Sequence, residues 1–196
     1  MPTVVALGDS LTFGKGGPVP YTAALAAQLG TDWTVVNAGR NGDWAVHLWI
    51  RFNADILSNT APDYLVIMGG VNDLAIGVQF GDTVKNLTAL YRVAHEHGSR
   101  VVALTVLPAG GSPGWPVTWD ANLKKLNDWI RSKPEGVDVV VDTYRMIGDP
   151  VDAWRLRPDY DSGDGVHLNN RGYEVLGRTV YAGVDWSPAQ PLERTD

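Results

Sequence analysis

Five short apolar runs, separated by longer segments with helical spacing, most constrain how this chain of 196 residues can fold. The runs are rich in β-branched residues and nearly free of charge, which is typical of strands that are buried on both faces of a sheet. They cover residues 3–7, 33–36, 64–68, 101–107 and 137–141. Because strands alternate with helices along the chain, the pattern predicts an α/β protein with a parallel sheet.

The segments between these runs predict the helices that cover the sheet. Their apolar residues recur at helical spacing, and Gly30 and Gly98 stand where two of the helices are expected to stop. The expected helices cover residues 20–29, 44–57, 82–98, 119–130 and the region after Asn169. We therefore expect a three-layer α/β/α arrangement whose five parallel strands have the order 2-1-3-4-5. Nothing in the sequence resembles a linker or a repeat, so it predicts a single domain over residues 1–196.

Composition excludes several classes of function. The formal net charge is −6 and the basic residues are scattered singly, so the basic stripe needed to bind nucleic acid is missing. There is no cysteine, and hence no disulfide, thiolate metal site or thiol nucleophile. No apolar run is long enough to span a membrane, and no signal peptide is recognisable. The sequence predicts a cytoplasmic protein, although a secreted form without its leader would look the same.

Small polar motifs follow three successive strands of the predicted sheet. Ser10 comes directly after the first strand, within the motif Gly8-Asp9-Ser10-Leu11. The second strand ends in Asn37-Ala38-Gly39, and the third is followed by Gly70-Val71-Asn72-Asp73. Because the carboxyl ends of parallel strands meet at one edge of a sheet, where ligands bind, we expect these motifs to lie side by side.

A fourth motif, Asp164-Gly165-Val166-His167, stands in the loop before the last helix. Serine is a weak nucleophile and needs a base. The carboxylate of Asp164 can turn back to hold one nitrogen of His167, which leaves the other nitrogen free to face Ser10. Asp142, at the end of the fifth strand, is an alternative partner for the histidine. The combination predicts acyl transfer through a serine.

Acyl transfer also needs hydrogen-bond donors for the negative charge that develops on the carbonyl oxygen. The backbone N–H groups of Ser10 and Gly39 and the side-chain amide of Asn72 are the candidates. Glycine at position 39 would allow the chain to approach the site closely.

With these motifs in this order, the chain resembles the SGNH (GDSL-type) hydrolases, a superfamily of esterases and lipases, from residue 3 to about residue 182. The resemblance implies a flavodoxin-like fold that needs neither a metal nor another cofactor. It also implies the roles of the site residues: Ser10 as nucleophile, His167 as general base, Asp164 as the residue that orients it, and Ser10, Gly39 and Asn72 as the oxyanion hole.

We expect the substrate to be a small-molecule ester with a short acyl chain, in the form of an alkyl ester, an aryl ester or an acetylated sugar. A thioesterase, a lysophospholipase or an acyltransferase would use the same residues, and a non-catalytic flavodoxin-like module could bind an anion at the Ser10 turn. Trp44 and Trp115 are candidates for substrate binding, with core packing as the alternative. Ser112 matches a G-x-S-x-G pattern, but Pro113 and Pro116 follow it, which indicates a loop serine.

Overall fold

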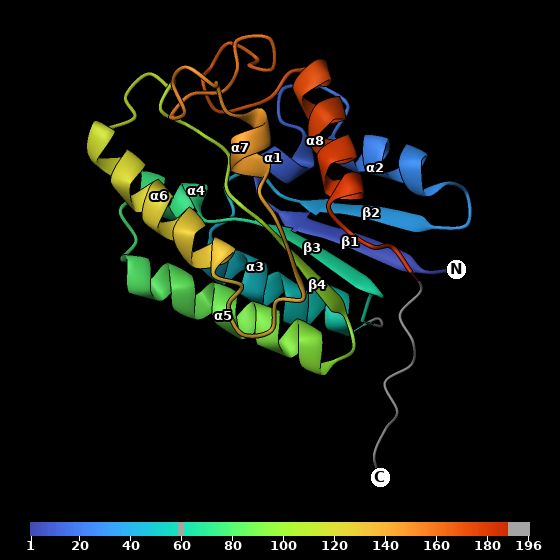
Figure 1. The fold of residues 1–196 in the computed structure, drawn as a ribbon. Coiled ribbons are helices and arrows are strands. Elements are labelled where there is room, and N and C mark those ends of the chain that lie inside the picture. Colours follow the sequence, from blue (N-terminus) through green and yellow to red (C-terminus); the bar gives the residue numbers. More distant parts are fainter. Residues whose placement is uncertain (59–60, 188–196) are drawn as a thin grey trace.

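The computed structural model describes residues 1–58 and 61–187, which form a three-layer α/β/α arrangement around a five-stranded parallel sheet (Figure 1). The strand order is β2-β1-β3-β4-β5, as the sequence predicts. The strands are β1 (Thr3–Gly8), β2 (Thr34–Gly39), β3 (Tyr64–Met68), β4 (Arg100–Leu104) and β5 (Val139–Val141). Gly8 pairs with Gly39 on one side and with Met68 on the other, so β1, β2 and β3 end at the same level. This register brings the motifs that follow them to one edge of the sheet.

Helices cover both faces of the sheet (Figure 1). On one face α2 (Tyr21–Leu29) and α7 (Thr143–Ile147) pack against α8 (Asn170–Ala182), and on the other α3 (Ala45–Arg51) and α6 (Val117–Arg131) contact α5 (Phe80–Glu96). Two short helices, α1 (Ser10–Phe13) and α4 (Val71–Ala75), begin just beyond β1 and β3. Among the residues described, no helix is both long and apolar enough to cross a membrane.

Burial explains why the apolar runs are continuous in some strands and interrupted in others. The central strand β3 is buried along its whole length, because helices cover it on both faces. The edge strand β2 is only partly buried, and the Val36 side chain is 42% exposed. On α6 the side chains of Leu123, Leu126 and Ile130 are fully buried, which confirms the predicted apolar face of this helix.

The structure differs from the expectations in three segments. The helix expected over residues 44–57 is an α-helix only to Arg51 and continues as a π-helix, η1 (Phe52–Leu57). The strand expected to reach residue 107 ends at Leu104 because the Asn127 carboxamide takes over the pairing: it accepts from the Val106 N–H and donates to the Val106 carbonyl, at 2.7 and 2.9 Å. The segment after Asp142, which is not among the expected helices, contains α7, which is short enough to end before Pro150.

Candidate active site

Ser10 occupies the first position of α1, directly beyond the end of β1. Asp9 caps this helix, since its Oδ1 accepts a hydrogen bond of 2.9 Å from the Leu11 N–H. A Cβ at Gly8 would lie 2.7 Å from the carbonyl oxygen of Met68, so only glycine fits there. Because the N–H of a first helical residue has no carbonyl one turn earlier to bond, the turn presents both the hydroxyl and the N–H of Ser10 at the edge of the sheet.

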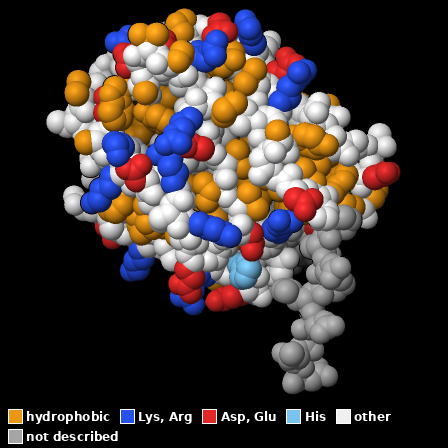
Figure 2. All heavy atoms as spheres, viewed as in Figure 1, with side chains coloured by type: hydrophobic (Ala, Val, Ile, Leu, Met, Phe, Trp, Pro, Cys, Tyr) orange, Lys and Arg blue, Asp and Glu red, His pale blue; other side chains and the backbone are white. Residues whose placement is uncertain are grey.

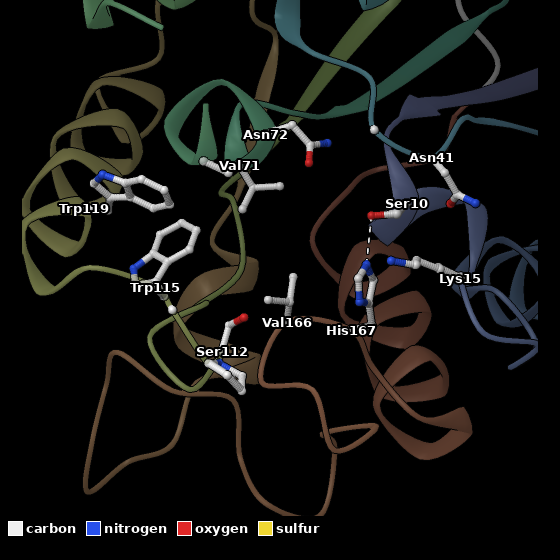
Figure 3. Close-up of a pocket in the computed structure, with 14 residues that line it drawn as sticks. Ser10, Lys15, Asn41, Val71, Asn72, Ser112, Trp115, Trp119, Val166 and His167 are labelled. Carbon is white, nitrogen blue, oxygen red and sulfur yellow. Dashed lines mark hydrogen bonds between the residues drawn. The ribbon is translucent and has the colours of Figure 1, made fainter. Parts of the chain in front are cut away.

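His167 connects Ser10 to Asp164 through hydrogen bonds at both ring nitrogens. Its Nε2 lies 2.9 Å from Ser10 Oγ, a hydrogen bond drawn as a dashed line in Figure 3, and its Nδ1 lies 2.6 Å from Asp164 Oδ2. Ser10 and His167 are 7% and 8% exposed. With a proton on Nδ1 shared toward the carboxylate, Nε2 is free to accept the serine proton. The three residues that the sequence singles out thus lie in one hydrogen-bonded series.

The Asp164 carboxylate is held in its charged form. Burial acts to raise its pKa, but hydrogen bonds from the His167 N–H and imidazole and from the Val166 N–H outweigh that effect and lower the pKa to about 2. The two N–H groups donate to Oδ1 over 2.8 and 3.0 Å, which leaves Oδ2 for the imidazole. At neutral pH a permanent negative charge therefore stands behind the histidine.

The loop that carries Asp164 and His167 is fixed at both ends by side chains. Asp161 Oδ1 accepts the N–H groups of Gly163 and Gly165, at 2.8 and 3.1 Å. Asn169 caps α8 by accepting the Gly172 N–H, and its amide donates back to the carbonyl of Asp161 at 3.0 Å. These bonds set the direction of the imidazole before any substrate binds.

Two of the three predicted oxyanion donors border the same cavity as His167. Ser10 and Asn72 line it together with His167. The Asn72 amide donates one hydrogen bond of 2.9 Å to the carbonyl oxygen of Asp43. An amide nitrogen carries two hydrogens, so this bond orients the side chain and leaves the second hydrogen for a ligand.

Gly39 is placed differently. Its backbone N–H donates to Oδ1 of Asn37 at 2.9 Å, and the residue does not line the cavity. The close approach expected at this glycine is present, since a Cβ would lie 2.7 Å from the Cα of Phe13. To act on an oxyanion, the Gly39 N–H would have to exchange the Asn37 oxygen for the ligand.

Sequence reasoning missed the ion pair between Asp43 and Arg51, which connects the strand-end motifs. The Arg51 Nε donates to Asp43 Oδ2 at 2.6 Å, and its two terminal nitrogens donate to the carbonyls of Ala38 and Gly8 at 2.9 and 3.2 Å. The Asp43 carbonyl in turn accepts the Asn72 amide. A lone arginine inside the apolar segment 44–57 was the signal that could have revealed it.

The cavity beside Ser10 has a volume of about 310 Å³ and an apolar wall opposite the serine (Figure 3). Trp115 and Trp119 form this wall and contact each other edge to face, with ring centroids 5.1 Å apart. The residues that line the cavity are Ser10, Lys15, Asn41, Gly42, Val71, Asn72, Ala75, Ser112, Pro113, Gly114, Trp115, Trp119, Val166 and His167. Trp44, which the sequence suggests for substrate binding, does not line it and instead stacks on His47 at 5.0 Å.

Two further residues considered in the sequence, Asp142 and Ser112, are not part of the hydrogen-bonded series that contains His167. Asp142 forms ion pairs with Arg131 and Arg145 and accepts the Thr105 hydroxyl. Its carboxylate therefore binds arginines of α6 and α7 and does not contact His167. Ser112 stands in the loop between β4 and α6, as expected, and lines the cavity.

A parallel three-layer fold, with a serine, a histidine and an aspartate in series at the carboxyl edge of the sheet, defines a class of α/β proteins equipped for acyl transfer. Comparison with known proteins makes the assignment more specific. The model of the GDSL-like lipase/acylhydrolase family matches residues 6–175, so the chain belongs to this family. The predicted superfamily and the predicted enzyme class, a carboxylic ester hydrolase, are thereby confirmed.

Individual relatives agree with this assignment. A multidomain esterase from Ruminococcus flavefaciens is 27% identical over 173 residues, which are 87% of this chain but only 22% of that protein. The solved lipase/acylhydrolase from Enterococcus faecalis is 26% identical, and the alignment covers 97% of this chain and all of that one with a TM-score of 0.73. A G-D-S-L family structure from Desulfitobacterium hafniense, 23% identical, has a TM-score of 0.80 over 94% of this chain and 100% of its own length.

Proposed function

We propose that this chain hydrolyses small esters with short acyl chains through an acyl-enzyme on Ser10. The observation that carries the proposal is the 2.9 Å contact between Ser10 Oγ and His167 Nε2 at the floor of an open cavity. A nucleophile, a base within hydrogen-bond reach and a group that orients the base are the three components that such a reaction needs.

In the first half of the reaction, Ser10 Oγ attacks the ester carbonyl while Nε2 of His167 takes its proton. The ionised Asp164 stabilises the imidazolium that forms. The bond to the alcohol then breaks as Nε2 returns the proton to the leaving oxygen. In the second half, the same nitrogen deprotonates a water molecule, which attacks the acyl-enzyme and releases the acid.

The negative charge on the carbonyl oxygen would be met by the Ser10 N–H and the free hydrogen of the Asn72 amide. Gly39 is the third proposed donor, after its N–H leaves the Asn37 oxygen. Donors that are already oriented need little rearrangement when the charge develops, which is why such groups contribute strongly to catalysis. The bond from Asn72 to the Asp43 carbonyl supports this role, because it fixes the amide beforehand.

The cavity supports a small substrate. Its volume of about 310 Å³ lies at the lower end of the range for ligand pockets, and its apolar wall is suited to a short acyl or an aryl group. We therefore propose that Trp115 and Trp119, rather than Trp44, contact the substrate.

Hydrolysis of p-nitrophenyl esters from acetate to palmitate, beside acetylated xylose, tests the proposal. Wild-type protein should hydrolyse the short esters fastest, and Ser10→Ala should lower the rate by roughly 10⁴-fold or more without changing the thermal unfolding temperature by more than a few degrees. Ser112→Ala removes another hydroxyl from the same cavity and should cost less than about tenfold. Equal rates in wild-type protein and Ser10→Ala would refute the proposed nucleophile.

A further inference from the structure

The cavity beside Ser10 carries a charge on one side only. Among the described residues that line it, Lys15 is the one with a permanent charge, and none is an aspartate or a glutamate. Within residues 1–58 and 61–187, no carboxylate forms an ion pair with Lys15. A cation beside a nucleophile and without a protein partner is available to a ligand.

The position of Lys15 depends on the backbone of the nucleophile itself. Gly14 adopts φ of 86°, which turns the chain at the end of α1, and the N–H groups of Gly14 and Lys15 both donate to the Ser10 carbonyl, at 3.1 and 3.3 Å. Figure 3 shows the amino end of Lys15 directed toward the His167 imidazole, and Ser10 lines the same cavity. The lysine therefore emerges at a fixed place relative to the reacting hydroxyl.

The two ends of the cavity differ in chemistry. Because His167 Nε2 must hand a proton to the leaving oxygen, the alcohol part of an ester has to lie on the side of the imidazole. Lys15 stands on that side, whereas Trp115 and Trp119 form the wall across the cavity (Figure 3). The alcohol part thus meets a cation, and the acyl part meets apolar side chains.

We propose that Lys15 binds an anionic group, a carboxylate or a phosphate, on the alcohol part of the ester. This inference rests on the proposed esterase function and names the substrate class for the same site. The chain as a whole has a formal net charge of −6, so its general field repels anions. A preference for an anionic ester would therefore have to come from this local cation.

The test compares matched pairs of acetyl esters that differ in the charge of the alcohol. The first pair is 3-acetoxybenzoate and its methyl ester, and the second is acetylated glycerol 3-phosphate and acetylated glycerol; the two pairs distinguish a carboxylate from a phosphate. The measured quantity is the ratio of kcat/KM for the anionic ester to kcat/KM for its neutral partner. Wild-type protein, Lys15→Met, Lys15→Glu and Lys15→Arg are compared at low and high ionic strength, with Lys85→Met as the control on the exposed surface of α5.

We expect Lys15→Met to lower the ratio about fivefold for at least one pair, which corresponds to one partly exposed ion pair. Lys15→Glu should lower it further, Lys15→Arg should restore most of it, and Lys85→Met should leave it at the wild-type value. High salt should reduce the preference in wild-type protein. A ratio that is the same in wild-type protein, Lys15→Met and Lys15→Glu for both pairs would overturn the inference while leaving the esterase proposal standing. If wild-type protein hydrolyses no ester at all, the esterase proposal falls and this inference falls with it.

Discussion

Two aspartates on either side of Ser10 show how differently one residue type can behave within a single site. Asp9, in the turn after β1, and Asp164, in the loop before α8, each accept a backbone N–H from two residues further on, at 2.9 and 3.0 Å. They differ in the second carboxylate oxygen. In Asp164 this oxygen binds the imidazole of His167, whereas in Asp9 it is buried without a hydrogen-bond partner.

The consequence is opposite charge behaviour. Burial raises the pKa of Asp9 to about 7, and the nearby charges of Asp43 and Asp73 add to the effect, although the bond from the Leu11 N–H opposes it. The pKa of Asp164 is about 2. Local turn geometry therefore fixes the contacts of only one carboxylate oxygen. The contacts of the other oxygen determine whether the group is a permanent anion.

Among the variants that test this comparison, the largest effect is expected from removing the charge of Asp164. Asp164→Asn should lower kcat by roughly 10⁴-fold, because the histidine loses both the correct tautomer and the charge that stabilises the imidazolium. Initial rates with p-nitrophenyl acetate measure the effect. Asp142→Asn is the matched control, since it changes the other carboxylate considered for His167, and its kcat should stay within about threefold of wild type. The reverse ranking would assign the orienting role to Asp142.

The next largest effect concerns the negative charge that develops on the carbonyl oxygen of the substrate. Asn72→Ala should lower kcat by roughly 10²–10³-fold with little change in KM, because the amide acts on the transition state. Asn72→Asp offers no hydrogen to the oxyanion when ionised and should be at least as slow. Steady-state kinetics separate kcat from KM, and an unchanged kcat in Asn72→Ala would remove this residue from the oxyanion hole.

The smallest effect on catalysis, and the sharpest test of the comparison, is expected from Asp9→Asn. The pKa of Asp9 is higher in the folded protein than its ordinary value of 3.8, so the folded state binds the proton more tightly. This favours folding at low pH, and the contribution is lost as the pH rises from about 4 to about 7. The free energy of unfolding should therefore fall by on the order of 4 kcal/mol across this window in wild-type protein relative to Asp9→Asn.

Urea unfolding between pH 4.5 and pH 8 measures this difference. Asp164 does not interfere, because its lowered pKa gives a stabilisation that is lost only as the pH falls below about 4. Asparagine keeps the oxygen that caps α1, so the variant should fold. If the two proteins have parallel stability curves, the Asp9 carboxyl does not titrate in this window and the proposed contrast with Asp164 is wrong.

The sequence by itself determined the architecture and the residues from which the site is built. Strand burial, helix spacing and small polar motifs are local patterns, so they predict the parallel sheet and the turns that carry Ser10 and Asn72. The strand order was predicted from what is usual for a doubly wound protein of this size. The Asp164 and His167 pair was also readable, because three positions of separation allow an aspartate to turn back on a histidine. The contacts of Arg51, within residues 44–57, were not readable, since its side chain donates to carbonyl groups of other elements.

Only the tertiary structure decided how these pieces contact one another. Ser10 and His167 are 157 positions apart, and their distance depends on the packing of the whole sheet and the loop before α8. The same holds for the link between Asp43 and Asn72, which lie 29 positions apart, and for the tryptophans that face the cavity. The pKa of Asp9 has a similar origin, because burial is a property of everything that surrounds a side chain. Sequence patterns report local conformation, whereas these contacts arise from groups that meet only when the chain has folded.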